Sequence, residues 1–81
     1  MSEERRKDLT KYVHQLIEDG RVAIRNVRRD ILHQLKEYGK EEHISEDEIR
    51  RQELEIQKIT DNHIDSLNAM QENKEKELME N

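Results

Sequence analysis

Apolar side chains recur at every third or fourth position along most of this chain, and no proline interrupts them. Because an α-helix has about 3.6 residues per turn, this spacing places the apolar side chains on one helical face. The pattern predicts one amphipathic helix over about residues 4–38 and a second over about residues 45–79. The apolar positions of the first helix are Leu9, Val13, Leu16, Ile17, Ile24, Val27, Ile31, Leu35 and Tyr38.

The predicted turn between the two helices covers about residues 39–44. Gly39 lies where a left-handed helix cap is expected, a position that glycine occupies more often than any other residue. Ser45 and Glu48 have the spacing of a capping box, which marks the start of a helix. Two long helices joined by a short turn predict an all-α fold, an antiparallel helical hairpin.

Composition limits how such a hairpin can be stabilised. Only 31% of the 81 residues are hydrophobic, and the two tyrosines are the only aromatic residues. A chain of this length buries a smaller fraction of its surface than a larger domain does, so a thick core is not expected. We therefore expect the apolar faces to pack against each other and, in a possible homodimer, to close a four-helix bundle. The expected packing residues are Ile24, Val27, Ile31, Ile56, Ile59 and Leu67.

Positive charge is concentrated on the first helix, although the whole chain has a net charge of −5. Residues 1–39 carry a net charge of +2 and residues 40–81 a net charge of −7. Four arginines fall within roughly a 100° arc of the first helix, and two lysines extend the same arc toward the N-terminus. We call this set the basic stripe: Lys7, Lys11, Arg21, Arg25, Arg28 and Arg29.

Two interpretations of the basic stripe are open. Arginine side chains bind phosphate oxygens through two parallel hydrogen bonds and stack on bases, which favours a nucleic-acid contact face. In the alternative, the stripe is a solvated helix face whose arginines form ion pairs with acidic residues of the second helix. Glu55, Asp61 and Asp65 are the candidates for that role.

Other classes of site have little support in the sequence. The four histidines lack metal-ligand spacing and the chain has no cysteine, so we expect neither a metal site nor a cofactor. No serine or histidine has the surroundings of a nucleophile, and a two-helix chain has no pocket for one, so we expect no enzyme activity. No apolar run is long enough to span a membrane, so we expect no membrane among the partners of this chain.

Five segments of the chain carry a resemblance to a known family: "EERRKDL" (3–9), "RVAIRNVRRD" (21–30), "ISEDEIRR" (44–51), "QKITDNHI" (57–64) and "KEKELM" (74–79). In the same order and with the same spacing, these segments resemble bacterial ribosome recycling factors. The resemblance covers nearly the whole chain but only the C-terminal part of that family, the two C-terminal helices of its helical domain. The first helix and the β domain of the family have no counterpart in these residues.

The resemblance implies a fold and a function. The family's helical domain is a three-helix bundle that lies along large-subunit ribosomal RNA, and it acts with elongation factor G to dissociate post-termination ribosomes. By position, the resemblance assigns RNA contacts to Arg21, Arg25, Arg28 and Arg29, with Lys7 and Lys11 flanking them. It implies a translation factor of the cytoplasm, or of an organelle matrix or stroma. The alternative is a helical dimerisation module that does not bind RNA.

Overall fold

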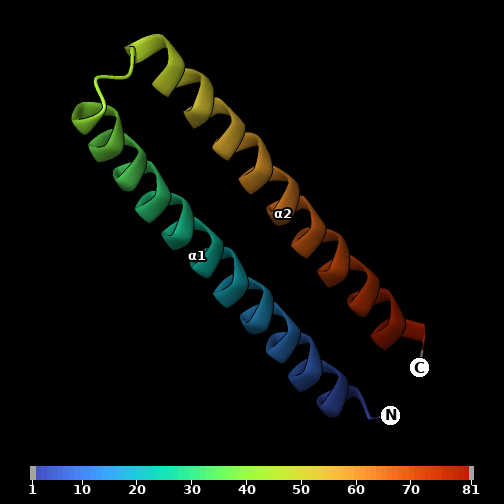
Figure 1. Ribbon diagram of the computed structural model, residues 1–81. Coiled ribbons are helices and arrows are strands. Elements are labelled where there is room, and N and C mark those ends of the chain that lie inside the picture. The colour runs from blue at the N-terminus through green and yellow to red at the C-terminus, as the bar shows by residue number, and fades with distance from the viewer. Residues whose placement is uncertain (1, 81) are drawn as a thin grey trace.

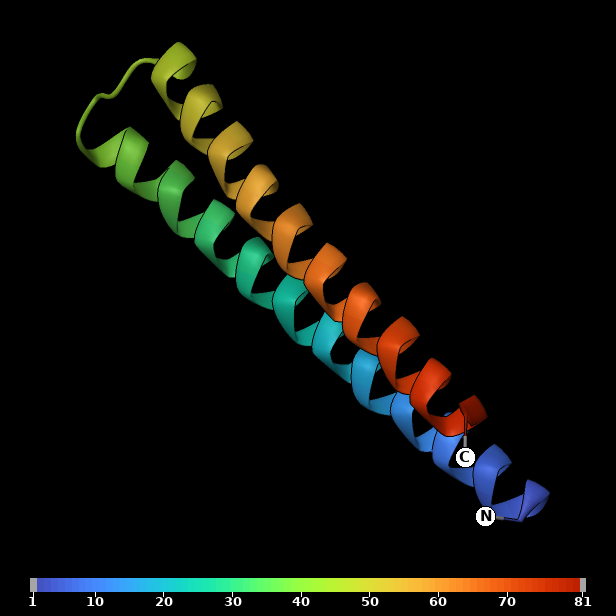
Figure 2. The same ribbon diagram turned by 90° about the vertical axis from the view of Figure 1, so that its right-hand side faces the viewer.

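The computed structural model describes residues 2–80 and contains two helices, α1 (Glu3–Glu41) and α2 (Glu46–Glu80). The helices lie antiparallel and side by side along their whole length, with both termini at one end (Figures 1 and 2). The Cα atoms span 61 × 15 × 9 Å, so the molecule is a single layer of two helices. The predicted helical hairpin is confirmed.

Serine side chains cap the start of both helices. The Ser2 hydroxyl accepts a hydrogen bond from the backbone N–H of Arg5 (3.1 Å), and the Ser45 hydroxyl accepts one from the N–H of Glu48 (3.2 Å). These bonds satisfy N–H groups that have no partner inside the helix. The Glu48 carboxylate pairs with Arg51 instead of completing a capping box.

The end of α1 differs from the sequence prediction. Gly39 is helical and buried, and the left-handed residue is His43, with φ of 54°. The N–H of Ile44 donates to the Gly39 carbonyl (2.9 Å) and the N–H of His43 to the Lys40 carbonyl (3.4 Å), which together form a Schellman cap. The prediction of a left-handed cap at Gly39 was wrong because Gly39 continues the helix, where Ile49 of α2 packs against it.

The side chains that α1 and α2 bury against each other form one continuous seam. In both helices the seam positions follow spacings of three and four that repeat every eleven residues. This repeat corresponds to about 3.67 residues per turn, close enough to the α-helical value for the helices to stay in contact with little supercoiling. The seam consists of Thr10, Val13, Ile17, Arg21, Ile24, Arg28, Leu32, Leu35 and Gly39 of α1 and of Ile49, Glu53, Ile56, Thr60, Ile64, Leu67, Gln71, Glu75 and Leu78 of α2.

The core within this seam is thin. Among residues 2–80, Ile17 is the only hydrophobic residue that is buried, at 8% exposure. At Gly20 the helices approach closely: a Cβ atom added there would lie 3.1 Å from Leu67 Cδ1. The hairpin is therefore held together by one line of half-buried contacts and leaves both of its broad faces open.

Candidate functional site

The whole basic stripe lies on α1, but the structure places its members in different surroundings. Arg21 and Arg28 are half-buried at seam positions beside α2. Lys7, Lys11, Arg25 and Arg29 are exposed. The stripe is therefore divided between arginines that contact α2 and side chains that face solvent.

Arg21 links the two helices. Its Nε donates to Asn68 Oδ1 (3.0 Å) and its Nη2 to Gln71 Oε1 (2.9 Å), both on α2. Its Nη1 donates to Glu18 Oε2 (2.9 Å) within α1, and 22% of the Arg21 side chain is exposed. With three N–H groups already engaged, the Arg21 guanidinium is held in place and has few donors left for a ligand.

Arg28 makes a weaker link to α2. Its Nη1 donates to Gln57 Oε1 across a long 3.4 Å, and its buried Nε has no hydrogen-bond partner among the described residues. Gln57 in turn donates to Asp61 Oδ1 (2.8 Å). Arg28 is thus half-buried at the seam, where it shares the lining of a shallow hollow with Ile24 and Ile56.

Arg25 and Arg29 are exposed, and neither has an ion pair or hydrogen bond with any residue in the range 2–80. The alternative interpretation expected ion pairs between the stripe arginines and Glu55, Asp61 or Asp65. Over the described part of the chain, no arginine of the basic stripe forms an ion pair with any of those three carboxylates. Two guanidinium groups are therefore presented to solvent, without a neutralising partner, on a chain of net negative charge.

A polar cluster continues the Arg21 contacts toward the open end of the hairpin. His14 of α1 pairs with Glu75 of α2, and Gln71 donates to Glu75 Oε1 (3.2 Å). The hydrogen bond from His14 and, after it, the one from Gln71 hold the pKa of the Glu75 carboxyl below its ordinary value of 4.5. The Glu75 carboxylate is therefore part of the polar link between the two helices.

The expected packing residues also fall into two groups. Ile24, Ile56 and Leu67 are half-buried in the seam. Val27, Ile31 and Ile59 are 56%, 42% and 51% exposed and line a shallow groove beside the seam. The apolar pattern of the sequence therefore contains two surfaces, one turned toward α2 and one turned toward solvent.

The linking role of Arg21 and its partners on α2 was not predicted from the sequence. A signal for it is present in the chain: Arg21 and Arg28 continue the eleven-residue spacing of the apolar seam positions. Residues that keep the period of a packed face contact the neighbouring helix even when they are charged, because their aliphatic stems pack against it. The arc of four arginines conceals this difference, since Arg25 and Arg29 depart from that period.

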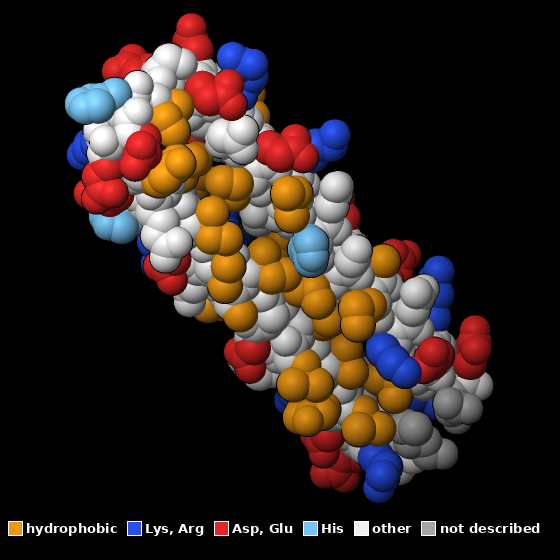
Figure 3. All heavy atoms as spheres, in the orientation of Figure 1, with side chains coloured by type: hydrophobic (Ala, Val, Ile, Leu, Met, Phe, Trp, Pro, Cys, Tyr) orange, Lys and Arg blue, Asp and Glu red, His pale blue; other side chains and the backbone are white. Residues whose placement is uncertain are grey.

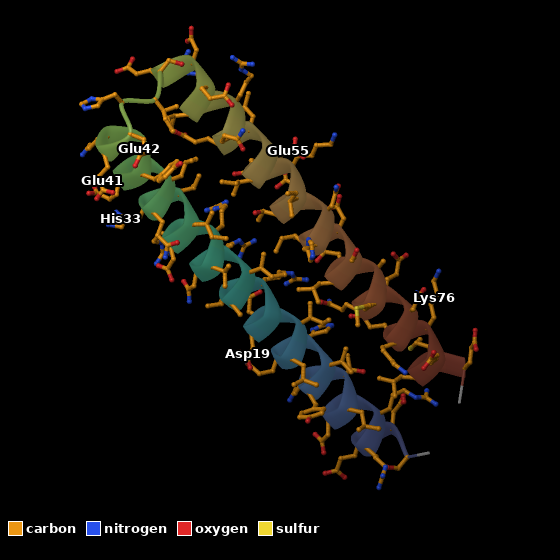
Figure 4. All side chains as sticks on the ribbon, in the orientation of Figure 1. Asp19, His33, Glu41, Glu42, Glu55 and Lys76 are labelled. Atoms are coloured by element: carbon orange, nitrogen blue, oxygen red, sulfur yellow. The ribbon has the colours of Figure 1, made fainter. Side chains whose placement is uncertain are left out.

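Other kinds of site find no support in residues 2–80. No group of three or more histidine, aspartate or glutamate side chains gathers there to hold a metal ion. His33 and Asp19 point away from α2 on the outer side of α1 (Figure 4), and His63 Nδ1 hydrogen-bonds to the Ile59 carbonyl of its own helix (2.8 Å). Neither described helix combines the length and the apolar character that crossing a membrane requires.

Comparisons with known proteins identify relatives of the hairpin. A family model described as ribosome recycling factor matches residues 1–79. The ribosome-recycling factor of Thermus thermophilus is 54% identical over 79 residues, which are 98% of this chain and 43% of that protein. The same factor from Xylella fastidiosa is 52% identical over 79 residues, with the same coverage, and that from Legionella pneumophila is 54% identical over 80 residues, 99% of this chain and 43% of that protein.

These relatives align with nearly the whole length of the hairpin and have the same residue at more than half of the aligned positions. The chain spans about 43% of the length of the curated relatives it matches. The match of the family model over nearly every residue shows that the chain belongs to the ribosome recycling factor family.

Proposed function

We propose that this hairpin is the ribosomal-RNA-binding element of a ribosome recycling factor. Its solvent-facing basic residues contact phosphate groups of large-subunit ribosomal RNA, and the protein helps to dissociate post-termination ribosomes together with elongation factor G. The mechanism is binding and displacement without covalent chemistry. The proposed place of action is the cytoplasm, or the matrix or stroma of an organelle.

The observation that carries this proposal is the pair of exposed arginines without partners, Arg25 and Arg29. A surface guanidinium group that no carboxylate of the chain neutralises is free to bind an anionic partner, and nothing on α2 pairs with either residue. Guanidinium groups suit phosphate because their parallel N–H donors match two of its oxygens. Lys7 and Lys11 extend the same exposed line toward the N-terminus. Arg28, which has one long hydrogen bond, is the next candidate for a phosphate contact.

The roles within the stripe differ accordingly. We assign phosphate contacts to Lys7, Lys11, Arg25 and Arg29, with Arg28 at the edge of the contact surface. Arg21 is a positioning residue, because its donors hold Asn68 and Gln71 and so fix the stripe relative to α2. The acidic second helix limits the surface on which RNA can lie, since its carboxylates repel phosphate.

The test compares two double variants with the same change in charge. Arg25→Gln/Arg29→Gln removes two exposed arginines from the basic stripe. Arg50→Gln/Arg51→Gln removes two exposed arginines from α2, where each pairs only within its own helix. Binding to ribosomal-RNA fragments is followed by fluorescence anisotropy across a salt series, and helicity by circular dichroism.

We expect the α1 double variant to bind RNA more weakly at unchanged helicity. The slope of log K against log salt should flatten by roughly 0.7–0.9 for each phosphate that is no longer neutralised. Replacement of Arg25 and Arg29 by lysine should give intermediate affinity, because lysine keeps the charge and lacks the paired donors. Equal decreases in affinity for the α1 and α2 variants would show a general charge effect and contradict the assignment. Hairpins that assemble but do not bind RNA would favour a helical interaction module instead.

A further inference from the structure

One acidic residue interrupts the exposed part of the basic stripe. The four exposed cations and this residue fall within an arc of about 40° on α1 and are, in chain order, Lys7, Lys11, Glu18, Arg25 and Arg29. Glu18 is seven residues from Lys11 and seven residues from Arg25, which places it at the centre of the four cations. At about 1.5 Å per residue, two cations about 6 Å apart lie on each side of Glu18, and about 21 Å separate Lys11 from Arg25.

The Glu18 carboxylate is fixed beside a shallow hollow on this face. Its Oε2 accepts a hydrogen bond from Arg21 Nη1 (2.9 Å), its Oε1 has no partner among residues 2–80, and 50% of the side chain is exposed. The hollow has a volume of about 570 Å³. Gln15 lines it too: its Nε2 donates to Asp19 Oδ1 (2.8 Å), and its Oε1 accepts no bond from a described residue. The middle of the stripe therefore presents hydrogen-bond acceptors, whereas its two ends present cations.

A carboxylate in the middle of a phosphate-binding surface selects for hydrogen-bond donors. An ionised carboxylate can only accept hydrogen bonds, and it repels phosphate groups. In nucleic acids, the donors that lie between two phosphate backbones are the exocyclic amino groups of the bases and, in RNA alone, the ribose 2′-hydroxyl. The 2′-hydroxyls are displayed along the minor groove of A-form RNA. Glu18 is thus suited to a group that DNA lacks.

The shape of the hairpin favours the same groove. Of its two broad faces, one carries an apolar band along both helices (Figure 3), and the basic stripe lies on the other. Each face is two helices wide, roughly 20 Å, which is too broad to enter the major groove of B-DNA, about 12 Å wide, or the narrow major groove of A-form RNA. The minor groove of A-form RNA is wide and shallow, so a broad face can lie across it and meet phosphates of both strands.

We propose that the hairpin binds double-helical RNA across its minor groove. One cation pair contacts phosphates of each strand, and Glu18 accepts a hydrogen bond from a ribose 2′-hydroxyl between them. Arg21 keeps the Glu18 carboxylate in place through its Nη1. This inference rests on the proposed function and adds to it the form of RNA that is bound and a residue that distinguishes RNA from DNA.

The test compares three duplexes of one sequence, made of RNA, of 2′-fluoro RNA and of DNA. 2′-Fluoro RNA keeps the A-form helix and all phosphates but has no 2′-hydroxyl donor. Their binding to the 81-residue chain is measured by fluorescence anisotropy at one salt concentration, because phosphate contacts depend on salt. We expect the wild type to bind the RNA duplex roughly 5-fold or more tightly than the other two, since each of them lacks a hydrogen bond to a charged acceptor.

Glu18→Ala removes the acceptor and should bind RNA and 2′-fluoro RNA with equal affinity. The matched control is Asp19→Ala, which removes the same charge from a side chain that points away from α2 (Figure 4). This control should keep the wild-type preference for RNA. The preference is a ratio of two affinities of the same variant, so a general effect of charge or of stability cancels. Circular dichroism verifies that both variants remain helical.

Two results would overturn the role of Glu18 while leaving the proposed function in place. One is equal binding of RNA and 2′-fluoro RNA by the wild type, and the other is the same preference for RNA in Glu18→Ala and Asp19→Ala. Single-stranded RNA that bound as tightly as the duplex would overturn the contact with two strands. If Arg25→Gln/Arg29→Gln did not weaken RNA binding, the proposed function itself would fail, and the role of Glu18 with it.

Discussion

Replacing Arg21 by glutamine separates the arginine that links the helices from those that face solvent. Arg21 makes two hydrogen bonds to α2, to Asn68 and Gln71, with 22% of its side chain exposed. A typical hydrogen bond contributes about 0.5–1.5 kcal/mol net, so two would contribute about 1–3 kcal/mol in a buried site. Because Arg21 is partly hydrated and Asn68 is exposed, we expect the substitution to destabilise the hairpin by about 1–2 kcal/mol.

The arginines of the stripe should differ in how much their replacement lowers the stability of the hairpin. Arg28 has one long hydrogen bond to Gln57, so Arg28→Gln should lower the free energy of unfolding by less than Arg21→Gln does. Arg25 has no bond to lose within residues 2–80, and Arg25→Gln should change the free energy of unfolding by less than about 0.5 kcal/mol.

Urea unfolding followed by circular dichroism at one protein concentration measures this order. A destabilisation of about 1–2 kcal/mol should lower the urea midpoint by about 1 M, given the shallow dependence on urea expected for so small a protein. RNA affinity should show the reverse order once it is measured on fully folded protein. Arg21 would not be a link between the helices if Arg25→Gln destabilised the hairpin as much as Arg21→Gln does, or if Arg21→Gln left stability unchanged.

Three further predictions concern the cap, the acid range and the core. His43→Gly should stabilise the hairpin by about 1 kcal/mol relative to His43→Ala in thermal melts, because only glycine adopts φ of 54° without a steric cost from Cβ. The pKa of Glu75 is lowered by its bond to His14, so its contribution to stability is present above the ordinary value of 4.5 and is lost as the pH falls through the folded-state pKa. Urea midpoints measured from about pH 6 to about pH 3 should therefore fall less steeply for Glu75→Gln than for the wild type, and equal slopes would contradict this. Ile17→Ala should cost about 2–3 kcal/mol by urea unfolding, toward the lower end for a buried side chain because the single-layer hairpin hydrates the space left behind.

The two helices and the start of the second were predictable because their signals are local. Apolar spacing defines a helical face over tens of residues, and the Ser45 hydroxyl caps the helix that follows it through a bond three residues away. The concentration of positive charge on the first helix is equally a property of the sequence. These features need no knowledge of what the helix packs against.

The end of α1 was not predictable in the same way. Gly39 has the residue type of a left-handed cap, but Ile49 of α2 packs against it and requires a helical position without a side chain. The left-handed conformation is found at His43 instead, and the N–H groups of His43 and Ile44 hydrogen-bond to the last carbonyls of α1 at a small steric cost. The contact between Gly39 and Ile49 thus outweighs the low helix propensity of glycine, which is about 1 kcal/mol relative to alanine.

Two amphipathic helices, the basic stripe on the first and the acidic character of the second all follow from the order of the amino acids. Which arc of α1 faces α2 depends instead on how the two helices pack. The apolar residues of α1 cover a wider arc than α2 can bury. Part of this arc therefore lies in the seam and part in the open groove. The true seam is turned toward the arginines: Arg21 and Arg28 enter it, while Val27 and Ile31 stay exposed. The physical reason is that a helical periodicity fixes which residues share a face, whereas the position of the neighbouring helix fixes which part of that face is buried.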